Sequence, residues 1–403
     1  MLDRSQEIRI AVVNDVHPQE TPGAATIAYE FAKNLSNKVE VQFWFKNGIE
    51  VFGTNKYADT LWKEQNFFIV KRLPKYIREW FNFRILIRYI RSIYKFRPNL
   101  IWLNQIGNSF PLTIMVVNKI FKIKTLVTLH DFNLIVPRKL YPFDLEEEFP
   151  SRHSFSSKGF EKLISFTKIP KFAFKDSIRL RITYLVRLYF LRRLVNSMEH
   201  IVAISELQCK IYMNFGYRID AVINNGIDDC NCTRPVRNIN SIFFAGRMHG
   251  KGFTRLVSSI QKFPNWHLDF AGGEDLLHFA KKKLDSSQYT YHGVLKRGQL
   301  LEKIHEVSLV YVLSECFDVF PTITLESLKH GTLVITTYNT GNSDLVAAID
   351  EKLILDLNSN VDFDFLEKIS IYNQDTIQKI SSVAATIVSS EEVTLKYFAK
   401  FIS

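Results

Sequence analysis

The sequence predicts an α/β protein made of two doubly wound domains, each a parallel sheet flanked by helices. Its 403 residues are enough for two domains with separate hydrophobic cores. Short apolar runs alternate with helical patterns in both halves, which is typical of parallel sheets. A polar segment with few apolar residues, 228–240, has the composition of a domain boundary. We expect one domain at 1–222 and the other at 223–385.

The amino half begins with a strand, a turn and a helix. Residues 8–15 form an apolar run bounded by polar residues, which predicts a buried first strand. A turn at Pro22 and Gly23 leads into a helical pattern, and residues 39–45 predict the next strand. The loop at 16–24 is therefore expected at the carboxyl edge of the sheet, where ligands bind in such folds. The glycine fingerprint of dinucleotide sites is absent, so we do not expect NAD or FAD.

His130 and Asp131 directly follow a predicted strand at 124–129. A histidine just past a buried strand end can form a neutral or a charged hydrogen bond, according to its surroundings. We interpret Asp131 as an anchor of its loop rather than as a catalytic acid. Further along, residues 200–228 predict a strand, a helix that begins at Ser205 and a second strand.

The carboxyl half opens with a strand at 241–246 that ends in Gly246. Arg247 and Lys251 follow, and an amphipathic helix is predicted over 253–263. Glycines at such a turn let the backbone approach a ligand closely. The two basic side chains are expected to converge on an anion, Arg247 as a planar fork of donors and Lys251 as a point charge.

Two further segments follow in the same half. A strand that starts near 266 ends in Gly272 and Gly273, which predicts a second glycine turn. Residues 291–293 precede a helix predicted at 297–305. Each segment alone is a weak signal, so their value lies in their order along the chain.

The stretch 314–344 carries the most information about function. It holds two carboxylates, Asp318 and Glu326, eight residues apart around a helix start near Thr322. An apolar strand at 307–313 precedes them. A helix that opens at the carboxyl end of a parallel strand directs free amides and the positive end of its dipole into a crevice. Such a crevice suits a phosphate, with Glu326 one turn further along to reach a sugar hydroxyl.

These segments, in this order, resemble the donor site of the family-4 glycosyltransferases of GT-B architecture. The family pattern is an acidic residue, seven residues and then Glu. Asp318 and Glu326 match it, with Asp318 in place of the usual Glu. Phe320 and Pro321 replace a glycine-containing loop, and the loop at 16–24 has one glycine where the family usually has two.

The resemblance implies two Rossmann-like domains that face each other across a cleft, with a final helix at 386–403 packed back on the first domain. It implies a nucleotide-sugar donor in the second domain and an acceptor in the first, with no metal and no other cofactor. The implied catalytic residues are His130, Asp318, Arg247 and Lys251. The implied donor-binding residues are Gly23, Gly246, Arg247, Lys251, Gly272, Gly273, Val294, Phe320, Pro321, Thr322, Ile323 and Glu326.

The net charge of +11 is concentrated in two segments. Residues 71–97 carry nine Lys or Arg and one acid, and residues 158–193 carry ten and two. Both segments are rich in aromatic and aliphatic residues, which favours an interfacial face attracted to anionic lipid. A solvated helix face is one alternative and nucleic acid is another, but no nucleic-acid recognition motif accompanies the charge. We expect a membrane surface and no nucleic acid.

Cysteine usage and the start of the chain predict the compartment. The four cysteines show no paired spacing, which suits a reducing cytosol. The first residues are charged and do not form a secretory signal. Residues 98–118 lack charge but contain several Asn and a Pro, so they predict a strand, a loop and a helix rather than a membrane span. We expect a cytoplasmic protein at the inner face of the cell membrane.

The resemblance predicts a retaining glycosyltransferase that uses a nucleoside-diphosphate sugar. With the basic faces, it points to a saccharide or lipid-linked acceptor in the assembly of bacterial surface polysaccharide or lipopolysaccharide. Two alternatives stay open at this point: a sugar-nucleotide epimerase of the same architecture, and a catalytically inactive glycosyltransferase-like protein that binds membrane or partner proteins.

Overall fold

The chain folds into two compact α/β units, each built on one sheet. Of the described residues, those up to Gly226 and those from Ser390 onward form unit 1, and those within Ile227–Ser389 form unit 2. Both junctions lie a few residues later than the boundaries expected from the sequence. The computed structural model describes residues 8–18, 23–52, 80, 82–107, 110–135, 177–228, 238–248, 250–314, 317–356 and 374–402.

The sheet of unit 1 has seven strands in the order β3-β2-β1-β4-β5-β6-β7. All neighbours are parallel except β2 and β3, which form an antiparallel hairpin. The strands form because apolar runs are buried on both faces, as in all of β4 except its last residue. Their bounds are β1 Arg9–Asn14, β2 Glu40–Phe45, β3 Gly48–Val51, β4 Leu100–Gln105, β5 Lys124–Leu129, β6 His200–Ala203 and β7 Ala221–Val222.

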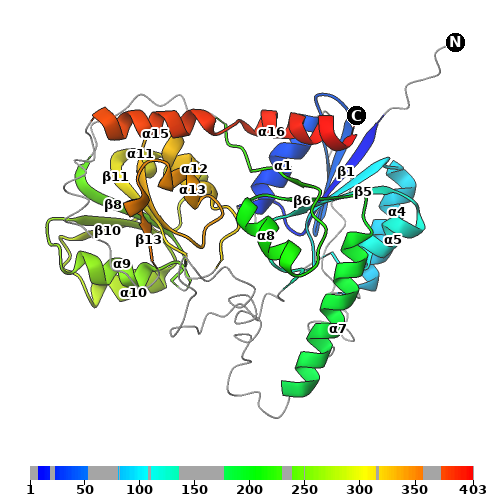
Figure 1. The fold of residues 1–403 in the computed structure, drawn as a ribbon, viewed down its shortest axis with the longest axis horizontal. Coiled ribbons are helices and arrows are strands. Elements are labelled where there is room, and N and C mark those ends of the chain that lie inside the picture. Colours follow the sequence, from blue (N-terminus) through cyan, green and yellow to red (C-terminus); the bar gives the residue numbers. More distant parts are fainter. Residues whose placement is uncertain are drawn as a thin grey trace. The chain divides into compact units, whose positions relative to one another are not determined.

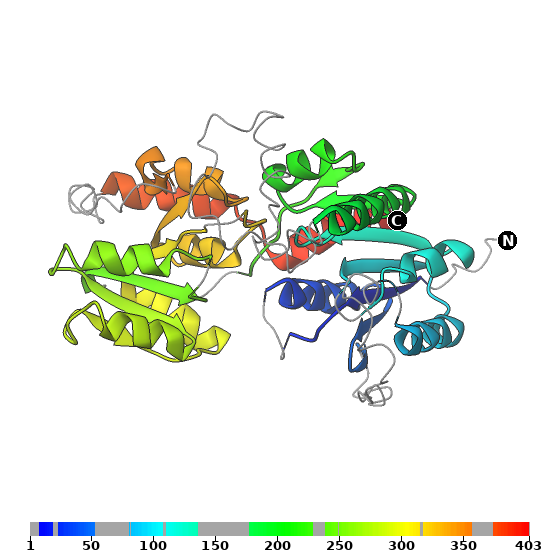
Figure 2. The same ribbon diagram turned by 90° about the horizontal axis from the view of Figure 1, so that it is seen from below.

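The last helix of the chain packs on the first helix of unit 1, and Figures 1 and 2 both show this α16 segment, in red, alongside α1. The Tyr397 ring lies 4.5 Å from that of Trp102 and 5.4 Å from that of Phe31, centroid to centroid. These buried rings join the helix pair to the sheet. The helices of unit 1 are α1 Ala24–Leu35, α4 Phe83–Phe96, α5 Ile114–Ile120, α7 Ser177–Asn196, α8 Glu206–Asn214 and α16 Ser390–Tyr397, followed by a π-helical turn at Phe398–Ile402.

Unit 2 contains a fully parallel sheet in the order β10-β9-β8-β11-β12-β13. Its strands are apolar and buried, with Phe243, Phe270 and Leu309 fully buried in the central ones. Both sheets confirm the predicted α/β class. The strands are β8 Asn238–Gly246, β9 His267–Gly272, β10 Tyr289–Tyr291, β11 Val307–Val312, β12 Leu333–Thr337 and β13 Ile354–Leu355.

The helices of unit 2 cover both faces of this sheet. Figure 1 shows α9 and α10 on one side and α11, α12 and α15 on the other. This follows from right-handed crossovers, because the chain first moves outward from β8 to β10 and then returns to β11. The helices are α9 Phe253–Ile260, α10 Glu274–Lys281, α11 Arg297–Glu306, α12 Thr322–Lys329, α13 Ser343–Ala347 and α15 Gln374–Thr386, with a 3-10 turn at Glu351–Leu353.

The reversal of direction makes the carboxyl ends of β8 and β11 the topological switch point of unit 2. One helix follows β8 on one face and another follows β11 on the opposite face, so the two loops diverge and leave a crevice there. The predicted glycine and acidic segments occupy these two loops. The sheet order alone therefore brings residues 247–252 next to residues 313–321.

The uncharged stretch at 98–118 contains β4 and the first residues of α5, which confirms the prediction of a strand and a helix there. Within the ranges given above, no helix is both long enough and apolar enough to cross a membrane.

Candidate active site

A tight loop carries Lys251 from the end of β8 to the start of α9. Gly252 precedes the helix with φ +70°. A side chain there would collide with Leu313 at the end of β11. Glycine therefore lets the loop after β8 pack against the loop after β11. This contact brings Lys251 close to the loop that carries Asp318.

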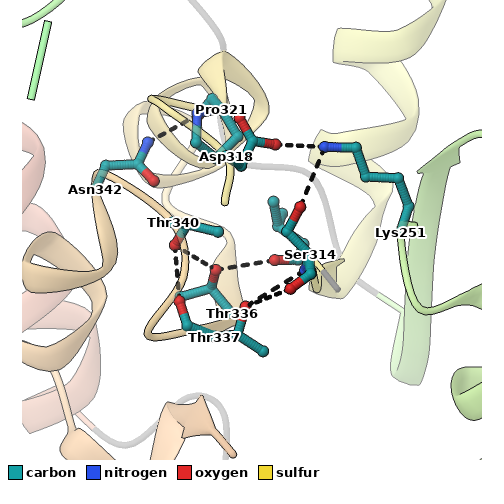
Figure 3. A network of polar contacts seen from close by, with 9 residues as sticks. Lys251, Ser314, Asp318, Pro321, Thr336, Thr337, Thr340 and Asn342 are labelled. Carbon is teal, nitrogen blue, oxygen red and sulfur yellow. Dashed lines mark hydrogen bonds and ion pairs between the residues drawn. The ribbon is translucent and has the colours of Figure 1, made fainter. Parts of the chain in front are cut away.

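In the polar network of Figure 3, the Lys251 ammonium bridges Asp318 and Ser314. It forms an ion pair with the Asp318 carboxylate and lies 3.4 Å from Ser314 Oγ. The Lys251 side chain is 39% exposed and that of Asp318 is 17% exposed. A cation that is held in place yet reachable from solvent can receive an anionic ligand with little reorganisation.

Backbone bonds fix the position of Asp318. Its amide donates to Asn339 O at 2.9 Å, and its carbonyl accepts from the Gly341 amide at 2.8 Å. Below it, Thr336 Oγ1 and Thr340 Oγ1 lie 2.9 Å apart, and Thr337 Oγ1 donates to Ser314 O at 3.2 Å (Figure 3). The loop after β11 is thus tied to the loop after β12.

The helix α12 begins a few residues after Asp318, the partner of Lys251. Thr322 is its first residue, and Asn342 Nδ2 donates to Pro321 O at 2.8 Å, which anchors the turn into the helix (Figure 3). Phe320 is buried, whereas Pro321, Thr322 and Ile323 are half-buried. The amides of a first helical turn have no partner within the helix and carry the positive end of its dipole.

Glu326 lies one turn further into α12 and is 7% exposed. Arg297 Nη2, at the start of α11, lies 3.2 Å from Glu326 Oε1. Burial raises the pKa of this carboxyl, and the charge of Arg297 acts in the opposite direction and lowers it. The Glu326 side chain is therefore enclosed and paired rather than solvated.

The strand next to β8 brings its glycine turn close to the site. Gly272 has φ +150°, and a side chain there would run into Gly246 O and Leu276. Gly273 then caps the start of α10 in an extended conformation. Val294, in the loop before α11, is 84% exposed.

Arg247 directly follows Gly246 at the end of β8, and its side chain is exposed. Gly246 thus ends β8, and Arg247 and Lys251 lie in the segment between β8 and α9. The Lys251 side chain is the one that contacts the loop after β11.

The remaining predicted site residues belong to unit 1. Gly23 caps the start of α1 with φ +93°, and a Cβ there would meet open space. His130 is 7% exposed, and its Nε2 lies 3.1 Å from Asn104 Oδ1. Because an amide oxygen only accepts, the neutral ring donates from Nε2. Burial lowers the pKa of His130 to about 4, so the ring is neutral near pH 7.

Asp131 anchors its own loop, as predicted. Its Oδ1 accepts from the Asn133 amide at 2.8 Å and its Oδ2 from Asn133 Nδ2 at 2.7 Å. Gln105 Nε2 donates to the same carboxylate at 3.2 Å. These bonds account for the acid without a catalytic role.

Three partners of the predicted site residues were missed by the sequence reasoning: Ser314 and Arg297 in unit 2 and Asn104 in unit 1. One signal pointed to Arg297, because a cation in the first turn of a helix opposes the helix dipole and needs a compensating partner. Ser314 and Asn104 are short polar residues near strand ends, and nothing in the local pattern sets them apart. Of the residues whose positions are given, no three His, Cys, Asp or Glu side chains are grouped to hold a metal ion.

Residues 235–372 match the family model described as glycosyl transferases group 1. The matched segment contains the whole Lys251–Asp318 network and the Arg297–Glu326 pair. A search of curated protein sequences found no match.

Solved structures share the fold over nearly the whole chain. Sucrose-phosphate synthase from Thermosynechococcus elongatus superposes with a TM-score of 0.65 at 13% identity, covering 97% of this chain and 98% of that one. A glycosyltransferase from Rickettsia africae gives 0.62 at 15% identity, covering 98% and 97%. Anabaena HepE, solved with UDP and glucose, gives 0.62 at 14% identity, covering 97% and 98%.

The shared fold is the GT-B fold of glycosyltransferases, as predicted. The family match over the carboxyl unit and the fold of the whole chain together support a glycosyltransferase activity.

Proposed function

We propose that this protein transfers a sugar from a nucleoside-diphosphate donor to a saccharide acceptor. The observation that carries the proposal is the Lys251 ammonium, held by Asp318 and Ser314 at the switch point of unit 2, beside the start of α12. A fixed cation and free helix amides at such a point suit a diphosphate. The structures of Anabaena HepE with UDP and with UDP-glucose support this donor class.

In this proposal, Arg247, Lys251 and the first amides of α12 stabilise the departing diphosphate. Charge on that group grows as the bond to the sugar breaks, so fixed positive groups stabilise the transition state more than the intact donor. The backbone turns at Gly246 and at Gly272–Gly273 leave room for the nucleotide. The protein cations supply the charge that a divalent metal supplies in other transferases, so the reaction proceeds without one.

The remaining donor contacts follow the family pattern. Asp318 positions the donor sugar, Glu326 accepts hydrogen bonds from the ribose hydroxyls, and Val294 and the Phe320–Ile323 turn flank the nucleotide. In unit 1, Gly23 gives the backbone room for a ligand. The Nε2–H of His130 is used by Asn104, so the neutral ring offers Nδ1 as an acceptor for a ligand hydroxyl.

The transfer retains the configuration of the anomeric carbon. The bond between that carbon and the diphosphate oxygen breaks as the acceptor oxygen forms its bond on the same face. The acceptor hydroxyl proton passes to the departing phosphate oxygen, so the chain supplies no covalent nucleophile and no separate base.

We also propose that unit 1 binds a lipid-linked acceptor at the inner face of a membrane. The outer face of α4 supports this. Phe83, Ile87 and Tyr94 are 63%, 51% and 64% exposed and form a stripe at helical spacing. Arg84, Arg88, Arg91 and Lys95 run beside that stripe, while Tyr89, Ile93 and Phe96 are buried on the opposite side.

The apolar surface extends beyond α4. Tyr94 contacts Phe121 just after α5, with ring centroids 5.4 Å apart, and Ile120 on α5 is 71% exposed. Figure 1 shows α4 and α5 side by side. On α7, Tyr189 and Phe190 are exposed. An aromatic and basic face of this kind favours an anionic lipid surface, where assembly of bacterial surface polysaccharide or lipopolysaccharide takes place.

A screen of radiolabelled sugar nucleotides against bacterial membrane lipid extracts tests the proposed function. We expect one donor to give a labelled lipid-linked product with the wild-type protein and much less with Lys251→Met. An epimerised donor in the absence of any acceptor would instead favour the epimerase. Failure to bind any nucleoside diphosphate would leave a glycosyltransferase-like protein without catalysis.

A further inference from the structure

Arg297 stands at the first position of α11 and reaches the buried carboxylate of α12. We propose that Arg297 is a positioning residue for nucleotide binding: its guanidinium holds Glu326 ionised and oriented to accept hydrogen bonds from the ribose hydroxyls. This inference rests on the proposed function, because it assigns Glu326 to the ribose. It adds a residue to the two acidic and two cationic side chains that the family resemblance implies, which are Asp318, Glu326, Arg247 and Lys251.

The helix itself does not explain the position of Arg297. A cation in the first turn faces the positive end of the helix dipole, which is unfavourable. Lys296 precedes it, so two adjacent basic residues open α11, and no acid lies in that first turn. An external carboxylate compensates this arrangement, and Glu326 Oε1, at 3.2 Å from Nη2, provides it.

The backbone around Arg297 is anchored, so its side chain starts from a fixed point. The Lys296 amide donates to Gln299 Oε1 at 3.0 Å, which closes the start of the helix. Just before it, the Gly272 amide donates to Gly293 O at 2.9 Å, and Tyr291 OH donates to Gly272 O at 2.9 Å. The loop that precedes α11 is therefore tied to the glycine turn of the site.

Exposure distinguishes the two partners. The Glu326 side chain is 8% exposed, whereas that of Arg297 is 48% exposed. A carboxyl so enclosed tends to take up a proton unless a positive charge faces it. A protonated carboxyl has one donor and fewer acceptor positions, so it would bind the hydroxyl donors of a ribose less well. Arg297 thus preserves the acceptor that the ribose requires.

The alternative role of the Arg297–Glu326 pair is purely structural: a clasp, meaning an ion pair that only stabilises the packing of α11 against α12. The two roles make different predictions for a nucleotide without ribose hydroxyls. A clasp supports any ligand of the site equally, whereas an arginine that acts through Glu326 matters only when the hydroxyls are present.

The test uses isothermal titration of the full chain with UDP, GDP and ADP and with their 2′,3′-dideoxy forms. We expect Arg297→Ala to weaken the ribonucleotide that binds by about tenfold or more, the size of a charge-assisted hydrogen bond. Its affinity for the dideoxy form should stay within about twofold of wild type. Arg297→Lys should retain part of the affinity, and the double variant with Glu326→Gln should bind no more weakly than Glu326→Gln alone.

Lys303→Ala is the matched control, because it breaks a surface pair with Glu306 on the same helix and should leave both affinities unchanged. Equal weakening of the ribose and dideoxy forms by Arg297→Ala would show a clasp and overturn the inference. Unchanged ribonucleotide affinity would overturn it as well, with the proposed function intact. If the wild-type protein bound none of the three diphosphates, the proposed function would fail first.

Discussion

The carboxyl edges of the two sheets have the same architecture but satisfy their polar groups differently. In unit 1, Asp15 accepts from the Phe110 amide at 2.8 Å, Asp131 is bonded within its own loop, and His130 is buried and neutral. In unit 2, Lys251 and Arg297 carry charge and remain partly exposed. The first edge uses polar groups to fix loops, and the second keeps cations accessible to an anion.

Unit 1 places its positive charge elsewhere, on the outer face of α4. Burial and the neighbouring charges of Arg84 and Arg91 lower the pKa of Arg88. The groups proposed to bind a compact diphosphate and those proposed to face an anionic membrane surface therefore belong to different units. The two units share one type of fold and differ in where their charged groups lie.

The largest expected effect lies at the edge of unit 2. Lys251→Met should lower kcat/KM by about 100- to 1,000-fold, because it removes the fixed charge to which the proposed mechanism assigns the departing diphosphate. Arg247→Ala should act in the same direction. Steady-state kinetics on the donor found by the screen measures both. Lys262→Met, an exposed lysine just after α9, is the control and should match wild type. Near-normal turnover in Lys251→Met would mean that the accessible cation at the sheet edge of unit 2 has no special role compared with the edge of unit 1.

The next effect concerns α4. Changing Arg84, Arg88 and Arg91 together to Gln should weaken binding to vesicles of phosphatidylcholine and phosphatidylglycerol by about 100-fold, since each basic group near such a surface contributes about 1 kcal/mol. Vesicle co-sedimentation measures it. Changing residues 281–283, three exposed lysines of unit 2, to Gln alters the net charge equally. If this control variant lost as much binding, the charge of the whole protein rather than the α4 face would be responsible.

The neutral state of His130 gives a smaller effect with a defined pH window. Its pKa is lowered from 6.5 to about 4, so the unfolded chain binds a proton that the folded chain rejects. The stability linked to this group is intact above pH 6.5 and is lost as the pH falls towards 4. The loss should reach about 2 kcal/mol at pH 5.

Urea unfolding of the wild type and of His130→Gln at pH 7.5 and pH 5 measures this term. The glutamine cannot titrate, so its unfolding free energy should fall less between the two pH values. The same decrease in both proteins would mean that His130 is protonated in the fold, and the edge of unit 1 would then carry charge after all.

The smallest expected effect is that of removing divalent metals. The proposed mechanism assigns the charge of the departing diphosphate to Lys251, Arg247 and the amides of α12. Activity after exhaustive EDTA treatment should therefore stay within about twofold of the untreated enzyme. Loss of activity that Mg²⁺ or Mn²⁺ restores would show that these protein groups are insufficient.

The strands and most helices could be predicted because apolar runs and glycine turns are local signals. Residues 8–15, 124–129 and 307–313 each form the buried strand that their composition predicts. Lys251 and Asp318 could be assigned to one site from order and resemblance. Their direct ion pair could not, because it depends on how Gly252 packs against Leu313 across two strands.

The sequence did not predict side-chain contacts between residues that lie far apart along the chain. Glu326 was expected to face a ligand, and its pairing with Arg297 depends on the packing of two helices that no local pattern encodes. Asn104 and His130 meet because β4 and β5 are neighbours, and their shared burial then decides the charge state of the ring. The described part of the expected basic helix face lies on α4 and on α7 from residue 186 onward, whereas residues 71–79 and 158–176 lie outside the described residues.

The central claim, that the carboxyl edge of unit 2 binds a nucleoside diphosphate through Lys251, is tested most directly by isothermal titration. UDP, GDP and ADP are titrated into the wild type, Lys251→Met and Lys262→Met. We expect at least one diphosphate to bind the wild type and the Lys262 variant equally, and to bind the Lys251 variant at least about tenfold more weakly. Equal affinity in all three proteins, or no binding to any, would contradict the claim.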